Sequence, residues 1–146
     1  MKILIDANIA LDVLLERQPF FASGVQILAL SKGNIELLIS ASTVTDLYYI
    51  INKQLKDKKA AINLLKRLLK NVNIAAVTNN EIYRAINLDW DDFEDAVQYA
   101  AGETILVDYL VTRNISDFSA AALPVVTPDE LLDILVKNDT AKDNES

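Results

Sequence analysis

Acidic residues recur along this chain where apolar segments end or where helical patterns begin. Asp6 directly follows the apolar run of residues 3–5, Asp46 lies early in an amphipathic segment, and Asp117 comes shortly after the apolar stretch at residues 109–111. In a parallel α/β fold such positions meet at one edge of the sheet, where ligands bind. Carboxylates gathered there repel one another strongly unless a divalent cation lies between them. The spacing therefore predicts a metal site.

The densest acidic group occupies residues 89–95, Asp-Trp-Asp-Asp-Phe-Glu-Asp, with five acids in seven positions. Asp92 and Asp95 are three residues apart and so share one face of a helix. Some of these acids are expected to cap a helix, and the others either form a solvated face or turn toward the sheet edge. Spacing alone does not decide which acid faces the site.

Each acid also has an ordinary structural interpretation. Asp6 is a suitable helix N-cap, and Asp46 is a favourable charge near a helix N-terminus. Asp117, close to Asn114, fits an Asx turn. These interpretations stay open for each residue taken alone, and it is the joint placement of the acids that favours a site.

The composition narrows the chemistry that this site can perform. The chain has 146 residues, with no His and no Cys. Imidazole bases, thiol nucleophiles, thiolate ligands and disulfides are therefore excluded. With oxygen as the main ligand type, Mg²⁺ or Mn²⁺ is favoured over zinc.

The elements that must position the acids alternate between strand-like and helix-like patterns, which predicts βα units around a parallel sheet. Strands are expected at residues 2–5, 35–39, 73–77, 109–112 and 125–126. Helices are expected at 8–15, 20–31, 42–55 and 61–69, and then from about residues 79, 91 and 128. Ser42 is the expected N-cap of the third helix. Phe93, Ala96, Val97 and Ala100 are the expected inward face of the sixth.

Length and a hydrophobic content of 51% indicate one domain, which we place at residues 1–136, followed by a flexible polar tail at 137–146. The N-terminal apolar run is too short for a signal peptide, and no segment is long enough to cross a membrane, so a cytoplasmic location is expected. The net charge of −7 disfavours broad nonspecific binding to nucleic acid. It still allows a nucleic-acid substrate held through a metal and a local basic patch.

Four segments together resemble a PIN domain, the nuclease module of many bacterial toxin–antitoxin pairs and of some RNA-processing factors. They are Ile-Leu-Ile-Asp-Ala-Asn at 3–8, Thr-Val-Thr-Asp-Leu-Tyr-Tyr at 43–49, Asp-Phe-Glu-Asp-Ala-Val-Gln-Tyr-Ala at 92–100 and Val-Thr-Arg-Asn-Ile-Ser-Asp-Phe at 111–118. The resemblance spans nearly the whole chain and implies a three-layer α/β/α fold with a five-stranded parallel sheet. It also implies a metal-dependent endoribonuclease in which a metal-activated water cleaves RNA phosphodiester bonds.

Carried over residue by residue, the resemblance implies a catalytic and metal-binding quartet of Asp6, Asp46, Asp95 and Asp117. The supporting residues are Asn8, Asp92, Glu94, Thr112 and Asn114. Two positions depart from the common pattern, because many members have Glu at position 46 and Asp at position 114. The shorter side chain of Asp46 and the neutral side chain of Asn114 affect how many metal ions the site is expected to bind and how active it is expected to be.

Several features point to a substrate and to partners. Half of the basic residues lie between positions 53 and 70, either as an RNA-contacting patch or, more commonly, as the solvated face of an amphipathic helix pair. Arg113 and Arg17 are nearer to the acids and are candidates for substrate binding. Tyr49 and Ile50 lie off the buried stripe of their helix and are candidates for a homodimer or antitoxin interface.

Three other functional classes were compared with the nuclease. The main alternative is a non-catalytic PIN-like module that binds RNA or a protein. It is suggested by the two departures from the common pattern, at Asp46 and Asn114, and by the net negative charge. A phosphotransfer receiver domain requires an acidic pair after the first strand and a late Lys, whereas Lys is absent from positions 71–136. A nucleotide-binding domain is disfavoured because the three glycines do not form a phosphate loop.

Overall fold

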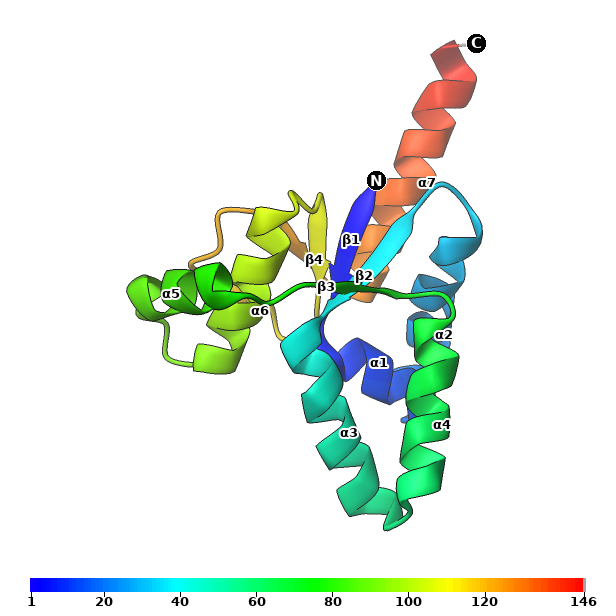
Figure 1. The fold of residues 1–146 in the computed structure, drawn as a ribbon. Helices are drawn as coiled ribbons and strands as arrows, with labels where there is room; N and C mark the ends of the chain where they lie inside the picture. The colour runs from blue at the N-terminus through cyan, green and yellow to red at the C-terminus, as the bar shows by residue number, and fades with distance from the viewer. Residues whose placement is uncertain (146) are drawn as a thin grey trace.

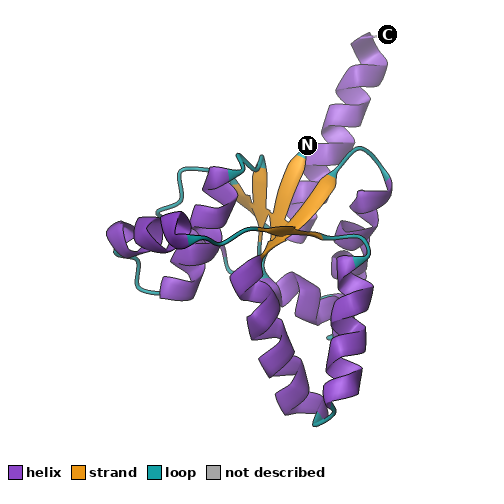
Figure 2. Ribbon diagram, viewed as in Figure 1, coloured by secondary structure: helices purple, strands orange, loops and turns teal. Residues whose placement is uncertain are grey.

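A parallel β-sheet with helices on both faces forms the centre of the molecule (Figure 2). The structure, a computed structural model, describes residues 1–145. The strands are β1 (Lys2–Ile5), β2 (Glu36–Ser40), β3 (Asn73–Ala75), β4 (Tyr109–Val111) and β5 (Val125–Val126). Their order across the sheet is β3-β2-β1-β4-β5, and every neighbouring pair is parallel. The predicted three-layer fold with a five-stranded parallel sheet is confirmed.

The helices follow the strands in the alternating order expected. They are α1 (Ala7–Leu14), α2 (Phe21–Ala29), α3 (Ala41–Leu55), α4 (Lys58–Leu69), α5 (Asn79–Leu88), α6 (Phe93–Thr104) and α7 (Pro128–Glu145). Two short 3₁₀ segments, η1 (Leu30–Lys32) and η2 (Ile115–Phe118), complete the described elements. Within residues 1–145, no helix combines the length and the apolar character needed to cross a membrane.

The central strands bury both of their faces, as continuous apolar strands of parallel sheets do. Ile3 and Ile5 of β1 belong to a core that α1, α2, α3, α4 and α7 complete. Leu4 points to the opposite face, where it packs in a second core with residues of α6 and η2. Both faces of the sheet are therefore covered.

The long hairpin of α3 and α4 extends beyond the carboxyl edge of the sheet (Figure 1). α3 begins directly after β2, with Ser40 as its N-cap: the Ser40 hydroxyl accepts from the backbone N–H of Thr43 at 3.2 Å. The prediction of Ser42 as the cap was wrong, since no loop separates strand from helix. The hairpin turns at Lys56, which adopts a left-handed conformation with φ of 53°.

Two other local predictions were wrong. β3 ends at Ala75, which pairs with the last residue of β2, because there is no partner strand beyond that point. Phe93 is 48% exposed, since it is the first residue of α6 and the buried face of that helix begins at Ala96.

The polar stretch from residue 137, expected to be a flexible tail, continues helix α7 as far as Glu145. α7 extends away from the sheet at its C-terminal end (Figure 1). Residues 137–141 are exposed, and their flexibility in solution stays a prediction.

Candidate functional site at the carboxyl edge of the sheet

Asp6 ends β1 at the middle of the sheet and is only 9% exposed. One carboxylate oxygen, Oδ1, accepts from the backbone N–H of Ala7 at 2.7 Å, which makes Asp6 the N-cap of α1. The other, Oδ2, accepts from Thr112 Oγ1 at 2.7 Å and from Asn8 Nδ2 at 3.1 Å. Burial raises the pKa of Asp6, whereas hydrogen bonds from Thr112, from the backbone of Ala7 and from Gln98 lower it. The structural role of Asp6 as a cap thus leaves its carboxylate at the sheet edge.

The predicted supporting residues Asn8, Thr112 and Asn114 form one network around Asp6. Thr112 Oγ1 accepts from Asn8 Nδ2 at 3.2 Å and from the backbone N–H of Asn114 at 3.0 Å. Thr112 is fully buried, and its own N–H donates to Val126. The network fixes the segment after β4 against the start of α1, so Asp6 is held in one orientation.

Asp95 lies in the first turn of α6, which Asp92 begins as its N-cap. Asp92 Oδ1 accepts from the backbone N–H of Asp95 at 3.0 Å. The pKa of Asp95 rises to about 7, first through burial and then through the negative charges of Asp92, Asp6, Asp117 and Glu94. The fold therefore gathers acids from β1, α6 and η2 around one half-buried carboxyl group.

Asp46 lies in the second turn of α3, where it meets Glu94 from the first turn of α6. Burial raises the pKa of Asp46, a hydrogen bond with Glu94 lowers it, and the charge of Asp92 raises it further. The pKa of Glu94 is raised in turn, mainly by the charge of Asp46. Asp46 and Glu94 thus form a second acidic pair next to the group around Asp95.

Asp117 lies in η2, exposed to solvent, with its backbone N–H donating to the carbonyl of Asn114. It borders an open cleft of about 380 Å³. The cleft is lined by Leu88, Asp89, Trp90, Asp91, Asp92, Asp95, Ser116, Asp117, Ser119 and Ala120. Two of the four predicted catalytic acids, Asp95 and Asp117, therefore face the same solvent-filled space.

Arg113 is held by a residue that sequence reasoning missed. Its guanidinium donates to Asp12 through Nε at 2.7 Å and Nη2 at 3.1 Å, and it lies 3.8 Å from the centre of the Phe20 ring. Asp12 is 1% exposed. One signal could have been read from the sequence: Asp12 is four residues after Asn8, on the same face of α1. Arg17, the other predicted basic residue, lies between α1 and α2 and is half-buried.

A model of the PIN domain matches residues 2–116 of this sequence. The chain belongs to the PIN domain family. Asp6, Asp46 and Asp95 fall within the matched stretch, and Asp117 is the first residue beyond it.

Individual PIN proteins resemble the chain over most of its length. It is 27% identical over 135 residues to ribonuclease VapC1 of Aquifex aeolicus (strain VF5), covering 88% of this chain and 92% of that protein. Its fold is similar to that in VapBC2 from Rickettsia felis bound to a promoter DNA fragment, with a TM-score of 0.71 and 20% identity over 87% of this chain and 98% of that one. It is also similar to a chain of a toxin–antitoxin complex from Klebsiella pneumoniae, with a TM-score of 0.63 and 26% identity over 86% and 96% of the two chains.

The acids of this PIN domain fit a hard divalent cation in donor chemistry and in charge. Every candidate ligand is an oxygen, as Mg²⁺ and Mn²⁺ prefer. Repulsion from neighbouring acids is the main cause of the raised pKa of Glu94 and adds to the effect of burial on the pKa of Asp95. Among residues 1–145, no three acidic side chains already stand at the spacing of a metal site. Closing such a site requires side-chain rotation, for which the exposed Asp117 has room.

Gln98 is a second residue that sequence reasoning missed. It lies one turn after Asp95 in α6 and is 3% exposed. Its amide is close enough to Asp6 to lower the pKa of that carboxyl group, yet its Nε2 has no hydrogen-bond partner of good geometry among the described residues. An unpaired buried amide nitrogen is costly in a folded protein.

Proposed function

We propose that this chain is a metal-dependent endoribonuclease that cleaves RNA phosphodiester bonds, and that it is the toxin of a toxin–antitoxin pair. The observation that carries the proposal is the convergence of acids from separate elements on Asp95, whose pKa reaches about 7. Membership of the PIN family and similarity to a ribonuclease support the same reaction.

Asp6, Asp46, Asp95 and Asp117 are the proposed ligands of Mg²⁺ or Mn²⁺. When bound among them, the cation supplies an activated water and neutralises charge on the scissile phosphate. Asp6 contributes a carboxylate oriented by Thr112 and Asn8, which costs little further ordering on binding. Asn8, Asp92, Glu94, Thr112 and Asn114 support these ligands, and Asn114 adds a neutral amide where a charge is common.

Two residues have further proposed roles, one as the acceptor of the proton of the attacking water and one in substrate binding. Asp95, which is half-buried and lies within reach of the charges of Asp92, Asp6 and Asp117, is the group proposed to accept a proton from the attacking water. Arg17 is the better candidate for contacting substrate phosphates, because two nitrogens of Arg113 are already bound to Asp12.

The proposed partners follow from the relatives. Toxin–antitoxin complexes are among the structures of similar fold, so a small antitoxin protein is the proposed partner of this chain. A homodimer and a cytoplasmic location are further parts of the proposal. An antitoxin encoded beside the gene and co-purifying with the chain is the expected finding.

A cleavage assay with matched variants tests the enzymatic proposal. Wild-type protein with Mn²⁺ is expected to cleave single-stranded RNA, and EDTA is expected to abolish cleavage. Asp6→Asn and Asp95→Asn are expected to lower the rate at least about 100-fold, because each removes a charged ligand next to the reacting phosphate. Asp139→Asn, which makes the same chemical change on the exposed side of α7, is the control and should keep full activity. Full activity in both site variants would refute the proposal.

One observation favours a second candidate, a non-catalytic module that binds RNA or protein. The described acids are not pre-arranged as a metal site, and position 114 carries no charge. Calorimetric titration with Mn²⁺ separates the two functions. Heat of binding that disappears in Asp6→Asn supports the nuclease, whereas no binding at millimolar Mn²⁺ supports the non-catalytic module.

A further inference from the structure

Charge is unevenly divided between the α3–α4 hairpin and the rest of the molecule. Residues 53–70 contain seven of the 14 basic residues and one of the 21 acidic residues, giving a formal charge of +6, while the rest of the chain carries −13. The seven basic side chains are exposed. Within the described part of the chain, none of them forms an ion pair. This hairpin is therefore a strongly positive region on an otherwise negative protein.

The outer face of α3 connects the acidic site to this positive region. α3 buries Thr43, Leu47 and Ile51 against the core. On its outer face, Asp46, Tyr49 and Lys53 follow at a spacing of three and four residues, which places them in one row along the helix. At 1.5 Å per residue, Lys53 lies about 10 Å along the axis from Asp46.

Tyr49 stands out within this row, because its side chain is 70% exposed. Its ring packs against Tyr48 at a steep angle, with ring centres 5.4 Å apart, so one neighbour contacts it while most of the side chain stays open to solvent. An exposed, oriented aromatic ring between an acidic site and a lysine is the arrangement that single-stranded nucleic acid uses for stacking.

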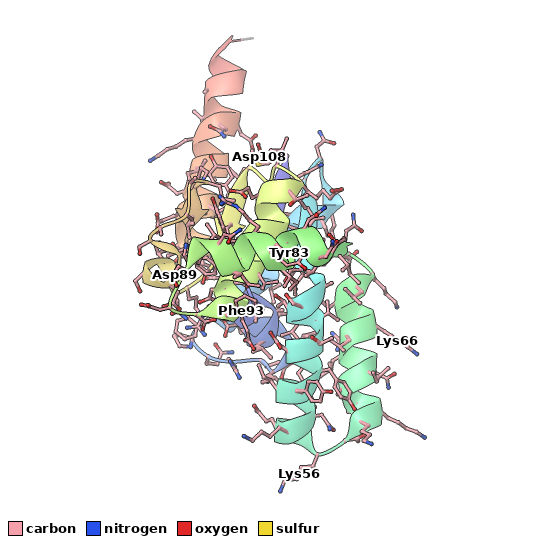
Figure 3. All side chains as sticks on the ribbon, turned by 60° about the vertical axis from the view of Figure 1, so that its left-hand side comes forward. Lys56, Lys66, Tyr83, Asp89, Phe93 and Asp108 are labelled. Carbon is pink, nitrogen blue, oxygen red and sulfur yellow. The ribbon has the colours of Figure 1, made fainter. Side chains whose placement is uncertain are left out.

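We propose that the outer face of α3 binds the RNA strand beside the cleavage site. In this arrangement Tyr49 stacks on a base, and Lys53 and Lys56 contact the following backbone phosphates. The inference rests on the proposed ribonuclease function and adds to it the path of the substrate. Figure 3 shows Lys56 at the tip of the hairpin, beyond the end of α3.

Charge favours RNA over a protein at this surface. A polyanion approaching a molecule of net charge −7 is repelled everywhere except near the basic hairpin, which can both steer and hold it. In a two-fold dimer whose α3 helices run parallel across this face, the same lysines of both copies would oppose one another, and like charges across an interface are unfavourable.

The proposed RNA-binding surface is tested by measuring the binding of a short fluorescein-labelled single-stranded RNA by anisotropy. EDTA is present so that the RNA is not cleaved. Tyr49→Ser is expected to weaken binding about tenfold, which corresponds to the loss of one stacked base. Tyr49→Phe keeps the ring and is expected to bind as wild type does. Lys53→Ala is expected to reduce the slope of log affinity against log salt by about 0.7, the effect of one lost phosphate contact on a single strand.

Lys66→Ala is the matched control, because Lys66 points away from α3 in Figure 3 and its loss changes the net charge by the same amount. An equal effect of Lys53→Ala and Lys66→Ala, or wild-type affinity in Tyr49→Ser, would overturn the proposal. So would wild-type binding weaker than about 10⁻⁴ M, the weak limit of nonspecific nucleic-acid binding. A change of molecular mass in Tyr49→Ser by light scattering would assign this face to a protein interface instead.

The two proposals fail separately. If the wild-type protein did not cleave RNA with Mn²⁺ but the α3 variants selectively lost RNA binding, the proposed nuclease function would be refuted and the proposed RNA-binding surface would stand. If the wild-type protein cleaved RNA and the α3 variants bound RNA normally, the proposed RNA-binding surface would be refuted and the nuclease function would stand.

Discussion

The carboxyl group of Asp95 shows how this fold concentrates negative charge on one residue. Asp95 is half-buried at the start of α6, and four other acids raise its pKa in addition to the effect of burial. A carboxylic acid with a pKa of about 7 is partly protonated at neutral pH. Its ionisation is thus coupled both to folding and to any cation that neutralises its neighbours.

Asp95 makes the stability of the cation-free protein depend on pH. Its pKa is about 7 in the folded protein, against an ordinary value of 3.8 for an aspartic acid. Its contribution to stability is therefore fully present below about pH 4 and is lost as the pH rises to 7. Thermal unfolding in EDTA is therefore expected at a lower temperature at pH 7 than at pH 5. Asp95→Asn should raise the midpoint at pH 7 and reduce this dependence, although Asp6, Asp46 and Glu94 act in the same direction. An unchanged pH dependence in Asp95→Asn would contradict the prediction.

Gln98 is a buried residue whose replacement is expected to stabilise the protein. Gln98→Met removes an amide nitrogen that has no partner among residues 1–145 and keeps a similar side-chain volume, so the free energy of unfolding should rise by about 1 kcal/mol. Mn²⁺ binding should weaken in the same variant, because the amide next to Asp6 is lost. Urea unfolding and calorimetry measure the two effects, with Gln54→Met on the exposed side of α3 as the control. Destabilisation by Gln98→Met would show that the amide is satisfied in solution.

At the level of elements, the ion pair between Asp12 and Arg113 joins α1 to the segment that follows β4. This segment also carries Thr112 and Asn114, which fix Asp6. Asp12→Ala is expected to destabilise the protein by about 2–3 kcal/mol, less than a fully buried pair would cost because Arg113 is 26% exposed. RNA cleavage should fall as well, since the network around Asp6 loses one of its supports.

The control for this ion pair is the solvent-exposed pair of Arg84 and Glu103, whose side chains are 48% and 37% exposed. Arg84→Ala is expected to cost less than about 1 kcal/mol. Chemical denaturation of both variants measures the difference. If Asp12→Ala cost no more than Arg84→Ala, the pair would not hold the site together.

At the level of the whole molecule, the boundary of the domain at residue 136 can be tested by truncation. Leu131 is buried in the core and Leu135 packs against it, whereas residues 137–141 are exposed. A protein ending at Val136 should unfold within about 2 °C of the full chain, because exposed residues contribute little. Leu131→Ala, in contrast, should cost about 2–5 kcal/mol. A large loss of stability on truncation would show that the end of α7 belongs to the domain.

Most of the fold could be predicted from the sequence, because its signals are local. The apolar strands, the helical stripes and the scarcity of glycine placed nearly every element to within a few residues. The errors lay at element ends, such as Ser42 and Phe93, where packing against a neighbour decides the boundary. Which acids face one another could be predicted only in outline, since that depends on the packing of α3 against α6.

By itself, the sequence determined the class of fold, the oxygen-only chemistry and the convergence of acids at one edge. The physical reason is that parallel strands share one direction, so residues after different strands meet at their carboxyl ends. Only the tertiary structure decided that Asp12 binds Arg113, that the buried amide of Gln98 lies close to Asp6 and that Asp46 meets Glu94. These contacts join elements far apart in the chain, and their distances follow from how helices pack on the sheet, which no local spacing encodes.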